Sequence, residues 1–297
     1  MGFIEQVYAK RKKLADVLVD EEYSGIREIV EELYPDKAHF IYELLQNAED
    51  TNATYVTFNL DEDRLVFEHN GDSFTEDDVF GITNIGKGTK KDDKEKIGKF
   101  GVGFKAVFAY TETPRIWSPT FAFQISDLVL PSGLTVDPEL GGITRFEFPF
   151  NNNKKNPSDA YAEVLAGLDD ISENTLLFLS SIKSIRWEVK NKKDSVVSRF
   201  VHTKYHIEML KIIGDRTVSS SHFLLFMQPA EGLRKQCIAI AFSLGFLSNI
   251  SEYDPAKELS EQFKIVVLRP GNVAVFFPAE KETSGLNGTY FRINILI

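Results

Sequence analysis

Three short segments that are rich in polar residues or glycine follow one another along the chain, and they restrict its fold more than any other feature. They read ELLQNAED at residues 43–50, HNGDSF at residues 69–74 and GKFGVGFK at residues 98–105. The segments between them carry apolar residues at helical or strand spacing. This order predicts that a helix face, a strand end and a glycine-rich turn contribute to one site.

The first polar segment lies on a predicted helix. Residues 4–33 have the spacing of two helices, and a third is predicted from Asp36 to Asp50. Spacings of four and three residues then place Glu43, Asn47 and Asp50 in one line. A carboxylate in that line can orient or deprotonate a water, and a carboxamide oxygen one turn later can bind Mg²⁺. An ordinary solvated helix face would give the same pattern.

The remaining elements follow from periodicity and turn residues. Alternation predicts a hairpin at residues 54–60 and 64–68, and a helix follows at residues 76–83. Residues 86–103 lack periodicity and predict a lid-like loop before a helix at residues 104–109. Further strands are predicted at residues 121–125, 144–150, 185–189, 195–203, 223–227, 237–242, 265–268, 273–277 and 290–297, and a further helix at residues 159–168.

The other two polar segments suit a nucleotide. Gly71 allows the backbone to approach a flat ligand, and short polar neighbours can contact the exocyclic amine of a base. The glycines of residues 98–103 free backbone N–H groups to converge on phosphate at a helix start. Their order, G-x-x-G-x-G, is the reverse of the dinucleotide-binding and kinase loops, so those classes are not supported.

Composition restricts the partners and the compartment. The 297 residues, 43% hydrophobic, are enough for two modest domains, and a polar stretch at residues 151–157 predicts the boundary. A net charge of -10 does not favour binding to nucleic-acid phosphates. Cys237 is the single cysteine, so no internal disulfide forms and a cytoplasmic location is expected. No signal peptide or membrane span is predicted.

Taken together, the three segments resemble the GHKL ATPase superfamily, which has an N-box helix, a D-x-G-x-G turn, a lid and a G-x-x-G-x-G helix start. The amino-acid sequence over about residues 36–127 is similar to the sacsin and NO VEIN branch of that superfamily. The resemblance implies an α/β (α+β) sandwich with the Bergerat ATP-binding fold at residues 1–155. It also implies a smaller α/β transducer-like domain at residues 156–297, compatible with a C-terminal truncation.

The resemblance assigns roles to individual residues. It implies that Glu43 positions and activates the attacking water and that Asn47 binds Mg²⁺. Asp50 matches an acidic position on the pocket-facing side of the same helix. The other nucleotide-binding positions that it implies are His69, Asn70, Gly71, Asp72, Gly98, Lys99, Phe100, Gly101, Val102, Gly103, Phe104 and Thr144.

The sequence departs from the family pattern around the base. His69 stands where the family has its adenine-reading aspartate, and Ser73 replaces the second glycine of that turn. Asn70 or Asp72 could substitute as the adenine reader, and a histidine at a strand end is equally a structural residue. Ile143 replaces the glycine that precedes the family's threonine.

The sequence therefore predicts an ATP·Mg²⁺-binding module with slow hydrolysis that drives a conformational switch, in a chaperone-like or defence-related role. Its expected partners are ATP and ADP, a second copy of the chain, and a protein client or other domains of a longer chain. A non-hydrolysing nucleotide sensor or a protein-interaction module is the alternative. A histidine-kinase catalytic domain is less favoured, because such domains generally lack the glutamate four residues before Asn47.

Overall fold

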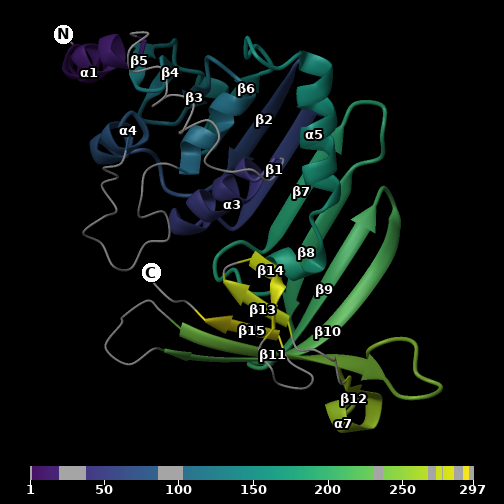
Figure 1. Ribbon diagram of the computed structural model, residues 1–297. Coiled ribbons are helices and arrows are strands. Elements are labelled where there is room, and N and C mark those ends of the chain that lie inside the picture. The colour runs from purple at the N-terminus through teal and green to yellow at the C-terminus, as the bar shows by residue number, and fades with distance from the viewer. Residues whose placement is uncertain are drawn as a thin grey trace. The chain divides into compact units, whose positions relative to one another are not determined.

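The computed structural model (Figure 1) describes residues 2–19, 38–85, 103–229, 237–266, 272–275, 277–283 and 290–293. The chain divides into two compact units. The first unit holds residues 1–171 and 185–194, and the second holds residues 172–184 and 195–297. The sequence places the change of domain after residue 155, whereas the first unit here also includes the helix that follows.

The first unit is an antiparallel sheet with helices. Its strand order is β7-β1-β2-β6-β3-β4-β5, and neighbouring strands from β1 to β5 in that order pair antiparallel. The elements of the first unit are α1 (Phe3–Val19), α3 (Phe40–Asp50), β1 (Tyr55–Asp61), β2 (Arg64–His69), α4 (Glu76–Ile82), the 3₁₀ helix η3 (Gly103–Ala109), β3 (Arg115–Trp117), β4 (Ala122–Ser126), β5 (Leu130–Gly133), the 3₁₀ helix η4 (Pro138–Leu140), β6 (Thr144–Pro149), α5 (Pro157–Asp169) and β7 (Ser184–Val189).

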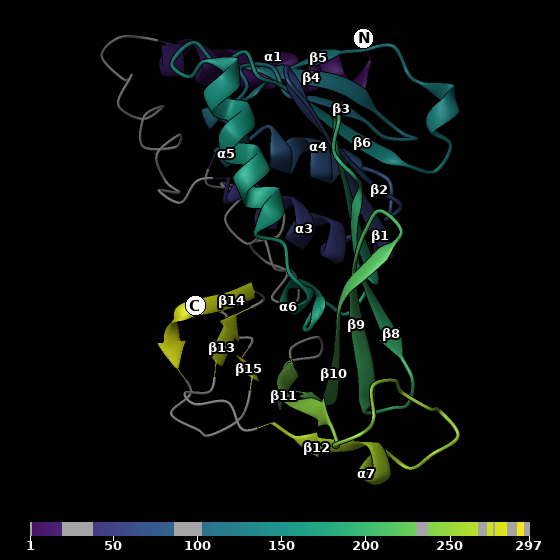
Figure 2. The ribbon, with the colours of Figure 1, turned by 90° about the vertical axis from the view of Figure 1, so that its right-hand side faces the viewer.

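The core of the first unit lies between one face of the sheet and the helices. Figure 2 shows α3, α4 and α5 on the same side of the sheet. Alternate residues of β1 are buried, including Phe58 and Leu60, as the period of a strand requires. Ile41 and Leu45 of α3 are fully buried. Burial of each such side chain contributes about 1.5–3 kcal/mol, so α3 is fixed by its apolar face.

Helix α5 packs closely against the start of α3. A Cβ atom placed on Gly167 would lie 2.6 Å from Cβ of Ala38 and 2.9 Å from Cδ1 of Ile41. The phenol of Tyr110 accepts a hydrogen bond from the Ala38 N–H (2.8 Å) and donates one to Glu163 (3.1 Å). The absence of a side chain at Gly167 therefore allows the contact that keeps α5 in the first unit.

The second unit is mainly antiparallel sheet. Its strand order is β14-β13-β15-β11-β10-β9-β8, with β12 also paired to β11, and β13 runs parallel to β15. The elements of this unit are α6 (Glu173–Leu176), β8 (Ser195–Val201), β9 (His206–Ile213), β10 (Arg216–Pro229), β11 (Cys237–Phe246), α7 (Leu259–Gln262), β12 (Phe263–Ile265), β13 (Asn272–Val275), β14 (Phe277–Thr283) and β15 (Tyr290–Ile293).

The structure corrects several expected elements. The helix expected at residues 104–109 is the 3₁₀ helix η3, which begins one residue earlier at Gly103. The strand expected at residues 265–268 is β12 at Phe263–Ile265, and the one expected at residues 273–277 is the pair β13 and β14. The expected start of the third helix at Asp36 lies outside the described residues. No helix in the parts of the chain that the structure describes is long and apolar enough to cross a bilayer.

The packing of α5 on α3 predicts an unusual response to Gly167→Ala. In an exposed helix this change stabilises by up to about 1 kcal/mol, because alanine loses less backbone entropy. Here the added methyl would overlap Ala38, so we expect a net loss of about 1–3 kcal/mol in the free energy of unfolding, measured in urea. Ala162→Leu, on the exposed side of α5, should change that free energy by less than about 0.5 kcal/mol. A Gly167→Ala variant as stable as the parent would contradict the packing described.

Candidate functional site

Helix α3 carries the line of polar side chains that the sequence predicts. Its buried face includes Leu44, Leu45 and Ala48. That face fixes the rotation of the helix about its axis, so that Glu43, Asn47 and Asp50 lie partly exposed. The apolar packing of α3 thus determines where these three polar groups are presented.

The start of η3 lies directly against Glu43. A Cβ atom placed on Gly103 would fall 1.9 Å from Oε2 of Glu43, so a larger residue there would displace the carboxylate from its present position. The imidazole Nε2 of His39, one turn before Glu43, lies 3.8 Å from its Oε1. The structure therefore brings the first and third polar segments together at this point. The third segment's other predicted residues lie outside the described part of the chain: Gly98, Lys99, Phe100, Gly101 and Val102.

The second polar segment packs on the C-terminal end of α3. A Cβ atom on Gly71 would lie 2.0 Å from Oγ1 of Thr51, the residue that ends α3. The Asp72 N–H donates to the Thr51 carbonyl (2.7 Å), and the Asn52 side chain donates to the Asp72 carboxylate (2.9 Å). Gly71 and Asp72 are therefore held beside the same helix as Glu43.

Asn70 has a structural role in this turn. Its Oδ1 accepts the backbone N–H groups of Thr54 and Tyr55 at 2.9 and 3.1 Å, and its Nδ2 donates to the Thr54 hydroxyl at 2.8 Å. Both ends of the amide are thus used to join the turn to the start of β1. In this arrangement the Asn70 amide is committed to the turn.

His69 lies at the end of β2 and is 2% exposed. Its Nδ1 accepts the Gly71 N–H at 3.1 Å, so that nitrogen carries no proton. Its ring packs near Phe67 and Phe146. Burial lowers the pKa of His69 to about 4, because the charged form would lose its hydration. His69 is therefore a neutral imidazole that closes the turn at physiological pH.

Thr144 faces His69 across the β2–β6 pair and is fully buried. Its hydroxyl has no hydrogen-bond partner among the described residues. A buried hydroxyl without a partner costs about 1–3 kcal/mol. Phe104, at the start of η3, contacts the neighbouring Phe146 (ring centroids 6.1 Å apart). The unsatisfied hydroxyl therefore lies in the same aromatic cluster as the start of η3.

Lys105 anchors η3 and is a residue that the sequence prediction did not include. Its side chain is fully buried, and its ammonium donates to the carbonyls of Ile82 (2.6 Å) and Leu128. Burial, and then the positive charge of Arg11, lower the pKa of Lys105 to about 7. The two carbonyl acceptors hold η3 in place, and with it the backbone of Gly103 beside Glu43.

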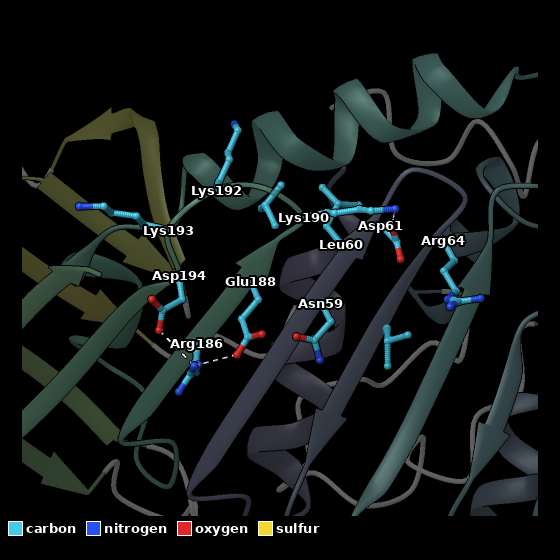
Figure 3. Close-up of a pocket in the computed structure, with 12 residues that line it drawn as sticks. Asn59, Leu60, Asp61, Arg64, Arg186, Glu188, Lys190, Lys192, Lys193 and Asp194 are labelled. Atoms are coloured by element: carbon cyan, nitrogen blue, oxygen red, sulfur yellow. Dashed lines mark ion pairs between the residues drawn. The ribbon is translucent and has the colours of Figure 1, made fainter. Parts of the chain in front are cut away.

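A separate polar pocket of about 560 Å³ lies on the other face of the first unit's sheet. Its walls include Asn59 and Arg64 from the exposed faces of β1 and β2 (Figure 3). Arg186 there pairs with Glu188 (2.8 Å) and Asp194 (3.1 Å). Glu43, Asn47 and Thr144 do not line this pocket, so it is distinct from the site on α3.

The residues of the α3 site fit a magnesium-bound nucleotide. Gly103 and Gly71 bring backbone directly against Glu43 and Thr51, near the two ends of α3. Carboxylate and amide oxygens, the donors that Mg²⁺ prefers, lie between them on Glu43, Asn47 and Asp50. The buried hydroxyl of Thr144 adds an unsatisfied donor and acceptor. The donor set is therefore one of oxygen atoms and backbone N–H groups, as a polyphosphate and its cation need.

Comparison with known proteins gives a family match that covers part of this site but not α3 or Thr144. Residues 65–130 match the family model described as the Sacsin domain, a range that includes His69, Gly71 and Gly103. The chain is 39% identical over 102 residues to sacsin of Homo sapiens, which covers 29% of this chain and 2% of sacsin. It is 36% identical over 99 residues to the protein NO VEIN of Arabidopsis thaliana, which covers 32% of this chain and 4% of that protein.

These matches support a sacsin-like sequence for this part of the chain, which spans only a few per cent of either relative's length. A solved structure of the N-terminal domain of a DNA repair protein covers 90% of this chain and 86% of its own, with 11% sequence identity. Its TM-score of 0.45 is a degree of likeness that supports no assignment of fold.

The buried position of His69 predicts a titration far below that of an exposed histidine. We expect its ring resonances in NMR spectra to titrate with a midpoint near pH 4, and the His69→Gln variant assigns them by their loss. The unfolded chain binds the proton near pH 6.5, so stability falls as pH falls from about 6.5 to about 4. The loss is about 3 kcal/mol. A midpoint near 6.5 would show that burial does not hold His69 neutral.

Proposed function

We propose that this chain binds ATP with Mg²⁺ along α3 and hydrolyses it slowly. The observation that carries the proposal is the contact between the Glu43 carboxylate and the side-chain-free start of η3 at Gly103. An acid that can activate water and a helix start that can donate backbone N–H groups to phosphate are thus adjacent. Hydrolysis of a phosphoanhydride needs both at one place.

Each residue then has a role that its chemistry allows. Glu43 orients and deprotonates the attacking water, and His39, 3.8 Å away, orients that carboxylate. The Asn47 carboxamide oxygen holds Mg²⁺, which when bound neutralises charge on the phosphate oxygens. The backbone at Gly103 and the preceding glycine-rich segment bind phosphate. Thr144 supplies a hydroxyl beside the base.

The same proposal places the first unit in the GHKL superfamily with a Bergerat-type fold, and makes the second unit its transducer. It is supported by the order of the three polar segments and by the sacsin-like match of residues 65–130. In such a system the output is a difference in nucleotide affinity between two conformations. The two conformations would bind differently to a partner in the cytoplasm. That partner would be a second copy of the chain, a protein client or further domains of a longer chain.

One observation favours a second function, nucleotide binding without hydrolysis. His69 occupies the position of the family's adenine-reading aspartate, and its Nδ1 is used by the Gly71 N–H. Asn70, one of the two substitutes expected from the sequence, uses its amide to join the turn to β1. Asp72 remains, with one hydrogen bond from Asn52. In this second function the site, with its weaker recognition of the base, binds a nucleotide without hydrolysing it.

Substitution of Glu43 separates the two functions. We expect Glu43→Gln to lower the rate of phosphate release by about 10²- to 10⁴-fold, because a general base contributes that much. The affinity for ATP measured by calorimetry should change less than threefold, about 0.7 kcal/mol. Glu62→Gln, in the exposed turn between β1 and β2, is the matched control and should alter neither quantity. Undiminished turnover in Glu43→Gln would refute the catalytic role, and a parent that binds ATP without turnover would support the second function.

Thr144 provides a test in which stability and binding change in opposite directions. Thr144→Val removes an unsatisfied buried hydroxyl at nearly constant volume, so the ligand-free protein should gain about 1 kcal/mol of stability. If the hydroxyl contacts the nucleotide, calorimetry should show ATP and ADP affinities about 3- to 10-fold lower.

A second threonine makes the comparison specific. Thr111 is also fully buried, but its hydroxyl is bonded to Asn151 (3.1 Å) and accepts the Thr113 N–H (3.2 Å). Thr111→Val should therefore destabilise by about 1–3 kcal/mol. Unchanged nucleotide affinity in Thr144→Val would remove Thr144 from the site.

A further inference from the structure

Three of the five histidines of the chain gather around one carboxylate in the second unit. His202 follows β8 in the turn to β9, while His206 and Glu208 lie on β9 and His222 lies on β10. The antiparallel register places His222 directly opposite Glu208, so their side chains share one face of the sheet. His206, two residues before Glu208, points to the same face. The sheet itself therefore builds the cluster.

The ligand atoms have the spacing of a metal site. Nε2 of His202 lies 2.7 Å from Oε2 of Glu208, and Nε2 of His222 lies 3.7 Å from Oε1 of the same carboxylate. One ligand atom from each of these three residues lies within 4.8 Å of the other two. Tetrahedral zinc with bonds of about 2.0–2.1 Å separates its ligand atoms by about 3.3 Å. Small side-chain movements would thus bring the three donors to one ion.

A second layer of hydrogen bonds orients two of these donors. The Ser220 hydroxyl donates to Oε1 of Glu208 (2.8 Å). Nε2 of His206 lies 3.0 Å from Nδ1 of His222. When Nδ1 of His222 donates its proton to His206, Nε2 of His222 keeps its lone pair for a metal. Metal-binding histidines usually have such a partner at the second ring nitrogen.

The histidine ring nitrogens of this cluster are buried, and a buried polar atom that lacks a partner destabilises the fold. His206 is fully buried and His222 is 3% exposed, and Nδ1 of His206 has no hydrogen-bond partner among the described residues. The rings of Tyr253 and Phe263 cover the cluster, with centroids 4.6 Å from His202 and 4.7 Å from His222 respectively. The His202 side chain, 24% exposed, leaves one approach open to solvent.

We propose that His202, Glu208 and His222 form a binding site for a divalent transition-metal ion, with Zn²⁺ as the ion that fits the donors. Two imidazole nitrogens and one carboxylate suit zinc and not Mg²⁺, which prefers oxygen alone. The fourth position faces the open side and takes a water. The ion would join the turn after β8 to β9 and β10, and so stabilise the sheet of the second unit. The site uses none of the residues on α3.

Zinc binding by the metal-stripped 297-residue chain tests this proposal. Competition with a chromogenic chelator should give one Zn²⁺ per chain, and the melting temperature should rise when Zn²⁺ is added. Glu208→Gln keeps the volume of the side chain and the acceptor for Ser220, and His202→Ala changes the most exposed ligand. Each should weaken Zn²⁺ binding by at least about 100-fold and abolish the thermal shift. Ser220→Ala should weaken binding about 10-fold, because Ser220 contacts Oε1 of Glu208 (2.8 Å) and Nε2 of His222 (3.4 Å) without being a proposed ligand itself.

The control is His39→Ala, which removes the histidine of a histidine–glutamate pair in the first unit. This variant should bind Zn²⁺ as the parent does. Circular dichroism and the melting temperature without metal establish that each variant folds. A parent that binds no Zn²⁺ at micromolar concentration overturns the proposal. Parent-like affinity in both Glu208→Gln and His202→Ala overturns it as well, because the ion would then bind elsewhere.

Discussion

The contact between the Glu43 carboxylate and the backbone at Gly103 is the constraint on which the candidate site depends. It exists because one residue has no side chain and because Lys105, two residues later, is held by two carbonyls. At the other end of α3, Gly71 meets Thr51 in the same way. Helix α3 is therefore approached at two points by backbone alone. A larger residue at Gly71 would meet the Thr51 backbone, and one at Gly103 would displace the Glu43 carboxylate.

The sequence predicts the elements of the first unit better than those of the second. Helix α3, the β1–β2 hairpin and α5 were predicted because their apolar residues repeat with a clear period over one buried face. In the second unit, β9 was not predicted and only part of β10 was. Their serines, histidines and charged residues hide the alternation, and their length comes from pairing with distant strands. Pairing between distant strands cannot be read from local periodicity.

The candidate sites show the same limit. Helical spacing alone places Glu43, Asn47 and Asp50 in one line. It cannot tell that the Asn70 amide closes a turn, since that depends on where Thr54 and Tyr55 lie. The H-x₃-H-x-E spacing of His202, His206 and Glu208 was visible in the sequence. The fourth member, His222, joins them only through the register of β9 with β10.

Both units keep a buried polar atom without a partner beside a candidate site, and the two cases differ in kind. The hydroxyl of Thr144 can be satisfied directly by a ligand, so its cost of about 1–3 kcal/mol is present only in the free protein. Nδ1 of His206 is not one of the proposed ligand atoms, so binding of the ion would not supply its missing partner. A proton on Nδ1 of His206 would leave its Nε2 to accept from Nδ1 of His222, 3.0 Å away. In that tautomer Nε2 of His222 keeps its lone pair for an ion, as the proposed metal site needs.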